Sequence, residues 1–132
     1  MRRPKRYYVG RRAHATQVFV IEDIELRRLA HLNHRGTADF DWGCAAPGAL
    51  ELSFSMLADV AGRRPTDLVC RAFCEEVVSR LDRAGFVTTD GDVAIWLMTA
   101  LLEFELGAER RSARVRRAAR GRSRDSDAGR GE

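Results

Sequence analysis

The sequence predicts an α+β domain in which a short N-terminal β-hairpin or a three-stranded antiparallel sheet packs on three helices. Three observations support this fold class: short aromatic and β-branched runs before residue 30, helical spacing of apolar residues from 50 to 104, and an Arg-rich C-terminal end. A chain of 132 residues suits one domain. We expect a single domain over residues 1–106, with a basic arm at 1–6, and a disordered basic tail over 107–132.

The strands are predicted from runs of aromatic and β-branched residues. Residues 7–9 and 17–21 form two such runs. The second run is almost continuously apolar, so we expect one of its faces and part of the other to be covered. Apolar and charged residues alternate between Ile24 and Leu29, which favours a third strand over a short helix. Residues 31–48 follow as a loop, because they are rich in Asn, Gly, Asp and Pro.

The helices are predicted from apolar residues at three- and four-residue spacing. The first helix follows Pro47 and ends near Gly62. The second begins after Thr66, a natural N-cap, and is stopped by Ala84-Gly85. A short extended link then leads to Thr89, which has an Asp three residues later and resembles the capping box of a third helix. The aromatic residues expected in the core are Phe40, Trp42, Phe54, Phe73 and Trp96.

Charge is segregated along the chain, although the net charge is only +4. Residues 1–12 carry six basic side chains and no acid, and residues 107–132 carry nine Arg and four acids. The middle, 13–106, carries eight Arg and fifteen acids. Basic ends beside an acidic body are typical of tails that bind polyanions. The candidate polyanion-binding residues are Arg2, Arg3, Lys5, Arg6, Arg110, Arg111, Arg114, Arg116, Arg117 and Arg120.

The C-terminal tail has one branched aliphatic residue, Val115, and no aromatic residue. It therefore has too little apolar surface to offset the entropy of ordering. Its Ala and Arg residues are good helix formers, and Arg110, Arg114 and Arg117 would line one face of a helix that a polyanion induces. Without aromatic rings for base stacking, such binding should be directed to the nucleic-acid backbone. The alternative is a solvated tail without a ligand.

A pattern of residues over about 7–101 resembles a known family. In chain order, its pieces are Phe40-Asp41-Trp42-Gly43, Ala46-Pro47-Gly48-Ala49, the helix of residues 50–60, Phe73, Val77-Val78, Leu81 and Val93-Ala94-Ile95-Trp96-Leu97. They are similar to a family of small domains of unknown function from bacteria, archaea, phages and plasmids, which carries Phe-x-Trp-Gly-Tyr and a Gly-Ser-Gly-Pro-like turn before apolar helices.

This chain departs from the family pattern at two places. Cys44 stands where members usually have Tyr, and Ala45-Ala46-Pro47-Gly48 replaces the Gly-rich turn. The resemblance implies an α+β body and a mobile-element origin, and it implies no activity.

A zinc site is one alternative that the residue types allow. His31, His34, Cys70 and Cys74 would supply four ligands of the kind that zinc prefers. The two cysteines, however, belong to the apolar face of the second helix, where Cys behaves as a small hydrophobic residue. We therefore expect no metal and no cofactor.

A cysteine nucleophile is a second alternative. Cys44 shortly precedes a helix N-terminus, a position that lowers the pKa of a thiol. His31 or His34, with Asp39 or Asp41, would complete a catalytic triad. Because nothing in the sequence brings these groups together, we expect no catalytic residue.

The acidic middle suggests contacts with proteins. Acidic side chains expected at the surface would dock on a basic groove, as DNA-mimic proteins do. The protein-interaction candidates are Glu22, Asp23, Glu25, Asp39 and Asp41.

We expect a cytoplasmic protein without a membrane partner. The longest apolar stretch free of charge, 93–102, is too short to cross a bilayer, and the basic N-terminus lacks the apolar run of a signal peptide. Three cysteines are an odd number, which favours a reducing compartment.

The composition and the resemblance together favour a non-enzymatic binding protein of mobile-element origin. We expect it to engage a nucleic acid or a nucleoprotein complex, as an accessory factor or as an anti-defence, anti-CRISPR-like inhibitor. The alternatives are a small Cys/His or metal-dependent enzyme, and an adaptor that binds a host protein complex through the acidic body without contacting nucleic acid.

Overall fold

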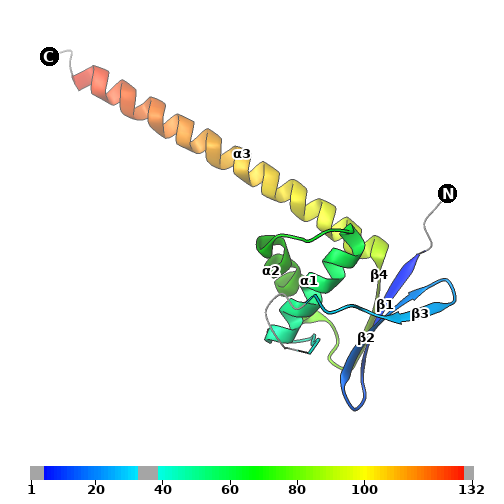
Figure 1. The fold of residues 1–132 in the computed structure, drawn as a ribbon. Coiled ribbons are helices and arrows are strands. Elements are labelled where there is room, and N and C mark those ends of the chain that lie inside the picture. Colours follow the sequence, from blue (N-terminus) through cyan, green and yellow to red (C-terminus); the bar gives the residue numbers. More distant parts are fainter. Residues whose placement is uncertain (1–4, 33–38, 130–132) are drawn as a thin grey trace. The chain divides into compact units, whose positions relative to one another are not determined.

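The structure, a computed structural model, describes residues 5–32 and 39–129, and the side chains of residues 5–32 and 39–120. The chain divides into two compact units, residues 1–98 and 99–132. The first unit contains an antiparallel sheet with helices on one of its faces (Figure 1). The α+β fold class predicted from the sequence is confirmed, and the sheet has one strand more than expected.

Four strands form the sheet in the order β3-β2-β1-β4, with antiparallel neighbours throughout. Their bounds are Arg6–Arg12 (β1), Thr16–Glu22 (β2), Glu25–Arg28 (β3) and Gly85–Thr89 (β4). The sequence predicted only an extended link where β4 lies. Its pairing with β1, in which Tyr8 lies opposite Thr88, joins segments about eighty residues apart, and a local apolar pattern of two residues carries no sign of it.

One face of the sheet, the inner face, forms part of the core. Strand residues alternate between the two faces, and Tyr8, Val18, Val20 and Phe86 are buried on this one. Gly10 also lies on this face, directly below the ring of Phe86. A Cβ added at Gly10 would lie 2.2 Å from a Phe86 ring carbon, so the packing of that ring requires glycine.

The helix α1 (Pro47–Ala61) begins and ends at the predicted signals, and α2 (Asp67–Glu76) begins at its predicted signal. Gly62 ends α1 with φ 69°, and the Thr66 hydroxyl caps α2 by accepting a hydrogen bond from the Val69 N–H. The second helix is shorter than predicted, because Val77 leaves the helical conformation (φ −121°) and only the short 3-10 helix η1 (Val78–Arg80) follows.

The expected core aromatic residues lie in the first unit. Phe40, Trp42, Phe54 and Phe73 are at most 3% exposed. Trp96 is half-buried, packs edge-on against Phe73 with a centroid distance of 4.8 Å, and donates a 2.8 Å hydrogen bond from Nε1 to Glu76.

The last helix, α3 (Asp90–Gly129), begins in the first unit and forms the described part of the second. Its start follows the predicted signal, since the Thr89 hydroxyl accepts a 3.1 Å hydrogen bond from the Asp92 N–H. The structure describes residues 107–129, for which the sequence predicts a disordered tail, as a continuation of this helix. The Ala- and Arg-rich composition of the segment favours a helix locally. Nearly all side chains from 108 to 120 are exposed, so packing adds little to it.

Candidate polyanion-binding surfaces

The inner face of the sheet carries three arginines, and carboxylates neutralise all of them. Asp59, in the last turn of α1, accepts hydrogen bonds from Arg6 (3.0 Å) and Arg27 (2.9 Å). It also accepts a 2.6 Å hydrogen bond from the buried hydroxyl of Tyr8. Arg6 is further held by Asp90, which accepts from its backbone N–H. Burial, followed by the hydrogen bond to Asp59, raises the pKa of Tyr8.

The third inner arginine, Arg12, pairs with Asp41. Its guanidinium lies 4.6 Å from the centroid of the Trp42 ring and donates to the Trp42 and Arg83 carbonyls. Burial opposes ionisation of Asp41, but hydrogen bonds from Arg12, the Trp42 backbone and Cys44 outweigh it and lower the pKa of that carboxyl. This ion pair ties β1 to the loop before α1.

These ion pairs change the status of two sequence candidates. The side chain of Arg6, a polyanion-binding candidate, is only 14% exposed and points to Asp59 and Asp90. Asp41, a protein-interaction candidate, is held by Arg12. Both side chains stabilise the fold through ion pairs within the chain. One feature of the sequence indicates this for Arg6: it lies two residues before Tyr8, so the two side chains point to the same face of the strand. Arg2 and Arg3 lie outside the described residues.

The opposite face of the sheet, called the outer face below, carries a different set of cations. Lys5, Arg11 and Arg28 are exposed, and none of them forms an ion pair with another described residue. The same face presents apolar and aromatic side chains from all four strands. They are Tyr7, Val9, Phe19, Ile21, Leu26 and Val87. The continuous apolar run of β2 led us to expect partial cover on this side, and within the described residues these side chains remain half-buried or exposed.

The arginines of α3 form the densest cationic segment of the described chain. Six lie between residues 110 and 120, all exposed and without an ion pair among the described residues. They are Arg110, Arg111, Arg114, Arg116, Arg117 and Arg120. At 1.5 Å per residue, these six charges occupy about 15 Å of helix, a spacing close to that of phosphates along one nucleic-acid strand.

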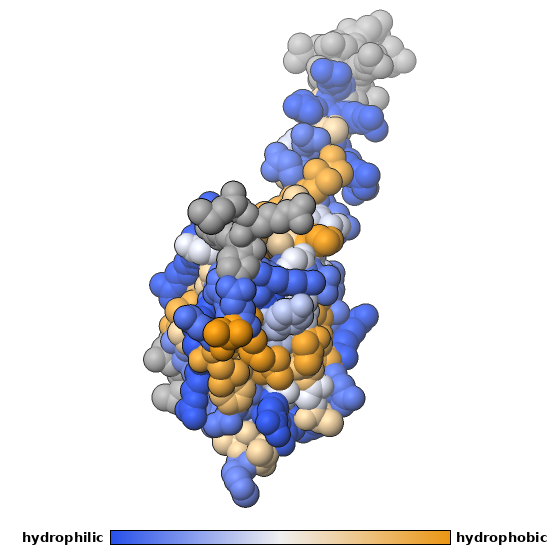
Figure 2. Space-filling model, turned by 90° about the vertical axis from the view of Figure 1, so that its right-hand side faces the viewer, coloured by the Kyte–Doolittle hydropathy of each residue, from blue (hydrophilic) through white to orange (hydrophobic). Residues whose placement is uncertain are grey.

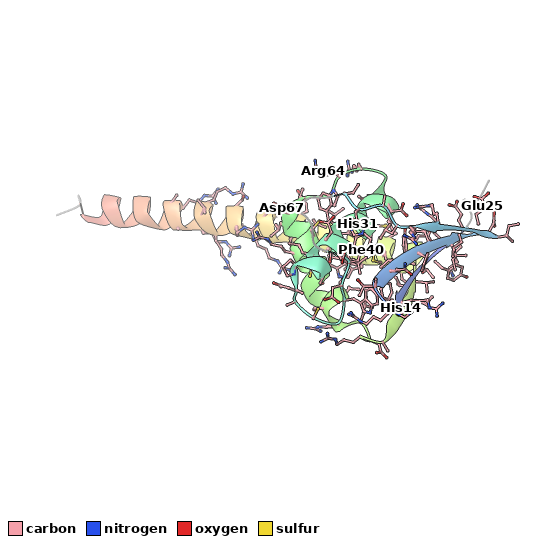
Figure 3. All side chains as sticks on the ribbon, turned by 60° about the horizontal axis from the view of Figure 1, so that its bottom comes forward. His14, Glu25, His31, Phe40, Arg64 and Asp67 are labelled. Atoms are coloured by element: carbon pink, nitrogen blue, oxygen red, sulfur yellow. The ribbon has the colours of Figure 1, made fainter. Side chains whose placement is uncertain are left out.

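The acidic candidates do not form one surface. Asp23 and Glu25 are exposed at the hairpin between β2 and β3, where Glu22 is half-buried, and Asp39 is exposed in the loop before α1. Figure 3 shows Glu25 at the far end of the hairpin, well apart from Phe40. A docking surface that unites all five acidic residues is therefore absent from the first unit.

The structure brings together only some of the residues proposed for zinc or for a nucleophile. Cys70 and Cys74 are buried in α2, where burial raises the pKa of the Cys74 thiol. His31 stacks on Phe40 at a centroid distance of 3.6 Å, and His34 lies outside the described residues. The Cys44 thiol donates to Asp41. Among the described residues, no three His, Cys, Asp or Glu side chains gather as metal ligands.

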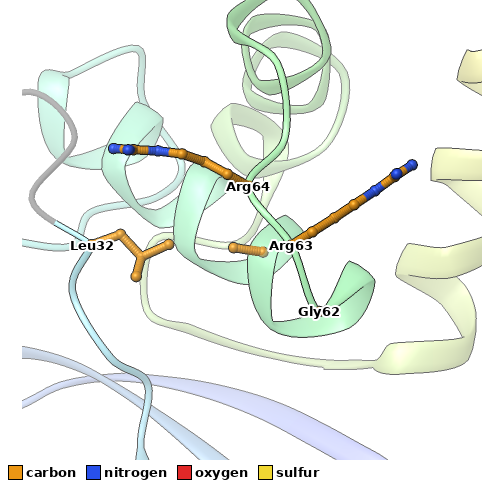
Figure 4. A pocket seen from close by; sticks show the side chains of 5 residues that line it. Leu32, Gly62, Arg63 and Arg64 are labelled. Atoms are coloured by element: carbon orange, nitrogen blue, oxygen red, sulfur yellow. The ribbon is translucent and has the colours of Figure 1, made fainter.

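A cavity of about 430 Å³ opens beside the end of α1 (Figure 4). Leu32, Ala58, Gly62, Arg63 and Arg64 line it. The two arginines point in opposite directions, and the guanidinium of Arg64 lies 5.3 Å from the centroid of the Phe54 ring. The lining offers no carboxylate, thiol or imidazole for acid–base or nucleophilic chemistry.

The sequence reasoning missed one buried acid. Glu51 of α1 is 3% exposed, and neither oxygen of its carboxylate has a hydrogen-bond partner among the described residues. The hydroxyl of Ser55, one turn later, is also buried without a hydrogen-bond partner among the described residues. The sign in the sequence is weak: Glu51 and Ser55 form a polar pair at i, i+4 in a helix that is mostly apolar.

Comparisons with known proteins identify the family of the first unit. No curated protein and no solved structure matches the chain. Within residues 5–32 and 39–129, no helix has the length and apolarity that a bilayer crossing requires. Residues 8–99 match a family of unknown function, DUF6166. This match covers more than half of the 132 residues, with most of β1, all of β2, β3 and β4, α1, α2 and the start of α3. The chain therefore belongs to the DUF6166 family.

Proposed function

We propose that the protein is a non-enzymatic nucleic-acid-binding protein and that the arginines of α3 contact the phosphate backbone. The observation that carries the proposal is the row of six exposed arginines without intramolecular ion pairs among the described residues. The arginines of the inner sheet face, by contrast, form ion pairs with Asp59, Asp90 and Asp41. A guanidinium that folding leaves unpaired is available to a phosphate.

The chemistry of the segment sets the mode of binding. Residues 107–120 contain no aromatic ring and no Asn or Gln that would read a base edge. Contacts made by arginine alone release counterions from the backbone and carry little sequence information. The segment should therefore bind duplex and single-stranded nucleic acid of any sequence, with an affinity that falls steeply as salt rises.

The proposal extends to nucleoprotein complexes, which present the same phosphate chemistry. An accessory or anti-defence role for a protein of mobile-element origin follows from this extension, with a cytoplasmic complex of the host as the partner. Such a role requires the α3 arginines in the same way as binding to free nucleic acid does.

The test compares two triple variants with the same change in charge. Arg110→Gln, Arg114→Gln and Arg117→Gln remove one face of the α3 array, whereas Arg63→Gln, Arg71→Gln and Arg80→Gln remove three exposed arginines of the first unit. Binding of a fluorescent DNA duplex is measured by anisotropy at salt concentrations from about 50 to about 200 mM. Over this range, the affinity of a protein that contacts phosphates changes strongly with salt.

The slope of log K against log salt is negative, and the α3 variant should make it shallower by about 2 to 3, because each lost phosphate contact removes about 0.9 from its magnitude. The control variant should retain the slope of the unmodified protein. Equal slopes for all three proteins would reject a role for α3. An equal change of slope in both triple variants would show that only the net charge of the protein matters.

A further inference from the structure

We propose that the outer face of the sheet binds unpaired bases of a single-stranded nucleic acid, with the bases stacked on Tyr7 and Phe19. This site uses none of the α3 arginines, and its test does not depend on the function proposed for them. Figure 2 looks onto this side of the first unit and shows a central apolar area (orange) with hydrophilic side chains (blue) around it.

The outer face is unusually apolar for a sheet surface that no described residue covers. Val87 is 67% exposed and Leu26 63% exposed, although both lie at outward strand positions where polar residues are usual. Tyr7, 39% exposed, lies between them across the central strands. An apolar area of this kind with a polar border marks a binding surface.

The two aromatic rings lie on the two central strands. Tyr7 is opposite Ile21, and Phe19 is opposite Val9, so Tyr7 and Phe19 are diagonal neighbours on the same face. Diagonal neighbours in an antiparallel pair lie about 7–8 Å apart, within reach of adjacent bases of an extended strand. Every base has a π-face, so aromatic side chains on an open sheet bind single strands with little regard to sequence.

The charges of the sheet are sorted by face in a way that suits an anionic ligand. The inner arginines are neutralised, whereas the outer Lys5, Arg11 and Arg28 have no carboxylate partner among the described residues. None of the outward strand positions, from Tyr7 to Thr89, holds Asp or Glu. The Lys5 ammonium lies 5.5 Å from the centroid of the Tyr7 ring, so a cation is already held beside one stacking position.

Space for the backbone lies at one end of this face. Gly85 is opposite Arg11 and has no side chain. A depression of about 440 Å³ opens there, lined in part by Val9, Arg11 and Val87. A sugar-phosphate unit that continues from a base stacked on Phe19 would meet the guanidinium of Arg11 in this depression.

The charges also favour nucleic acid over a second copy of the chain. A two-fold contact between two outer faces would join two surfaces that each carry Lys5, Arg11 and Arg28 and no Asp or Glu at their outward strand positions. A single-stranded nucleic acid supplies base rings that match the apolar surface of this face, and phosphates that supply the negative charge it lacks.

The experiment separates the rings from the rest of the apolar face. The ring variant is Tyr7→Leu with Phe19→Leu, which keeps both positions apolar, and the matched control is Leu26→Ser with Val87→Ser, which removes exposed aliphatic groups from the same face. Binding of a twelve-nucleotide oligo(dT) and of a twelve-base-pair duplex is measured in the full chain at a fixed salt concentration, and thermal melting checks the fold of each variant.

The ring variant should weaken oligo(dT) binding by at least fivefold, because one base–aromatic stack contributes at least about that factor. Duplex binding should stay within twofold, since the bases of a duplex are already paired and stacked and offer the rings no free face. An oligonucleotide with 5-iodouracil should form photo-crosslinks to Tyr7 or Phe19. The loss of oligo(dT) affinity and the crosslinks support the site whether or not the α3 triple variant binds duplex normally.

Three outcomes overturn the proposal. Unchanged oligo(dT) affinity of a folded ring variant rejects stacking. Crosslinks confined to residues outside the outer face place the single strand elsewhere. Sedimentation showing a dimer that the Leu26→Ser, Val87→Ser variant dissociates makes the face a contact between two copies of the chain.

Discussion

The hydroxyl of Tyr8, at the centre of β1, donates a 2.6 Å hydrogen bond to the carboxylate of Asp59 in the last turn of α1. Two arginines, Arg6 of the same strand and Arg27 of β3, donate to the same carboxylate. Asp59 thereby joins three residues of the inner sheet face to one helix end. Together with the Arg12–Asp41 pair, this arrangement holds the inner cations of the sheet within the fold, so that among the described cations of the sheet the outer ones remain for a ligand.

Replacing Asp59 should destabilise the first unit. Asp59→Ala leaves the side chain of Arg6, only 14% exposed, with Asp90 at 3.8 Å as its remaining carboxylate, and it leaves the Tyr8 hydroxyl without its acceptor. We expect a loss of about 2–4 kcal/mol in the free energy of unfolding, measured in urea. Tyr8→Phe, which removes a single hydrogen bond to a charged group, should lose about 1–3 kcal/mol. A loss below 1 kcal/mol in Asp59→Ala would contradict the central role of this carboxylate.

The stability of the protein should fall at alkaline pH because of Tyr8. Its folded-state pKa is raised by burial and by the hydrogen bond to Asp59, so the folded protein holds the phenolic proton when the unfolded chain releases it. Below the ordinary pKa of about 10 both states are protonated and pH has no effect through this group. Above it, unfolding releases a proton and stability declines. Urea denaturation at pH 9 and pH 11 measures the decline, which should be smaller in Tyr8→Phe.

The Arg12–Asp41 pair should act at the acid end of the pH range. The pKa of Asp41 is lowered in the folded protein, so its contribution to stability is complete above the unfolded value of about 3.8 and is lost as pH falls through the lower folded value. Arg12→Gln removes the principal partner of the carboxylate, and we expect it to reduce stability at pH 6 by about 1–2 kcal/mol. The difference between the two proteins should narrow below pH 3. A constant difference down to pH 2 would show that Arg12 acts through packing on Trp42 instead.

Gly10 should be required by the ring above it. A methyl group at this position would lie 2.2 Å from the Phe86 ring, so Gly10→Ala must displace the ring and should reduce the free energy of unfolding by about 1–3 kcal/mol. Combining Gly10→Ala with Phe86→Leu should recover part of that loss, as a double-mutant cycle measures. Gly91→Ala is the control, because the nearest atom to an added Cβ there is 3.9 Å away. Additive effects of the Gly10 and Phe86 substitutions would contradict the clash.

The parts of the fold that local patterns specify were predicted from the sequence. The Thr66 N-cap, the Gly62 helix end and the start of α3 at Thr89 each depend on residues within one turn of one another. The strand β4 was not predicted, because its place beside β1 depends on pairing with Tyr7–Arg11, far away in the chain. Non-local pairing of this kind leaves no periodic signal in a segment of five residues.

The candidate site shows the same limit. The count of basic residues near the N-terminus treated Arg6 and Arg11 alike, but they lie on opposite faces of the sheet, and only the inner face meets Asp59 and Asp90. Strand alternation divides the cations into two sets, and the partner of each set is known only when the helices are in place. The apolar run of β2 likewise predicted cover of one face and of part of the other, and in the structure Val18 and Val20 are buried while Phe19 and Ile21 on the outer face are half-buried.

The helix of residues 107–120 should be marginal in the free chain and strengthened by a polyanion. Its side chains are nearly all exposed, and Arg110 with Arg114, as well as Arg116 with Arg120, place like charges at i, i+4, which opposes the helix. Bound phosphates would remove this repulsion. Hydrogen exchange should show weak protection of these amides in the free protein and at least tenfold stronger protection with a DNA duplex. Ala108→Gly with Ala119→Gly, which lowers helix propensity by about 1 kcal/mol at each position, should weaken duplex binding without changing the unfolding of the first unit. Strong protection in the free chain would show that the helix is stable without a ligand, and the arginine array would then be preformed for binding.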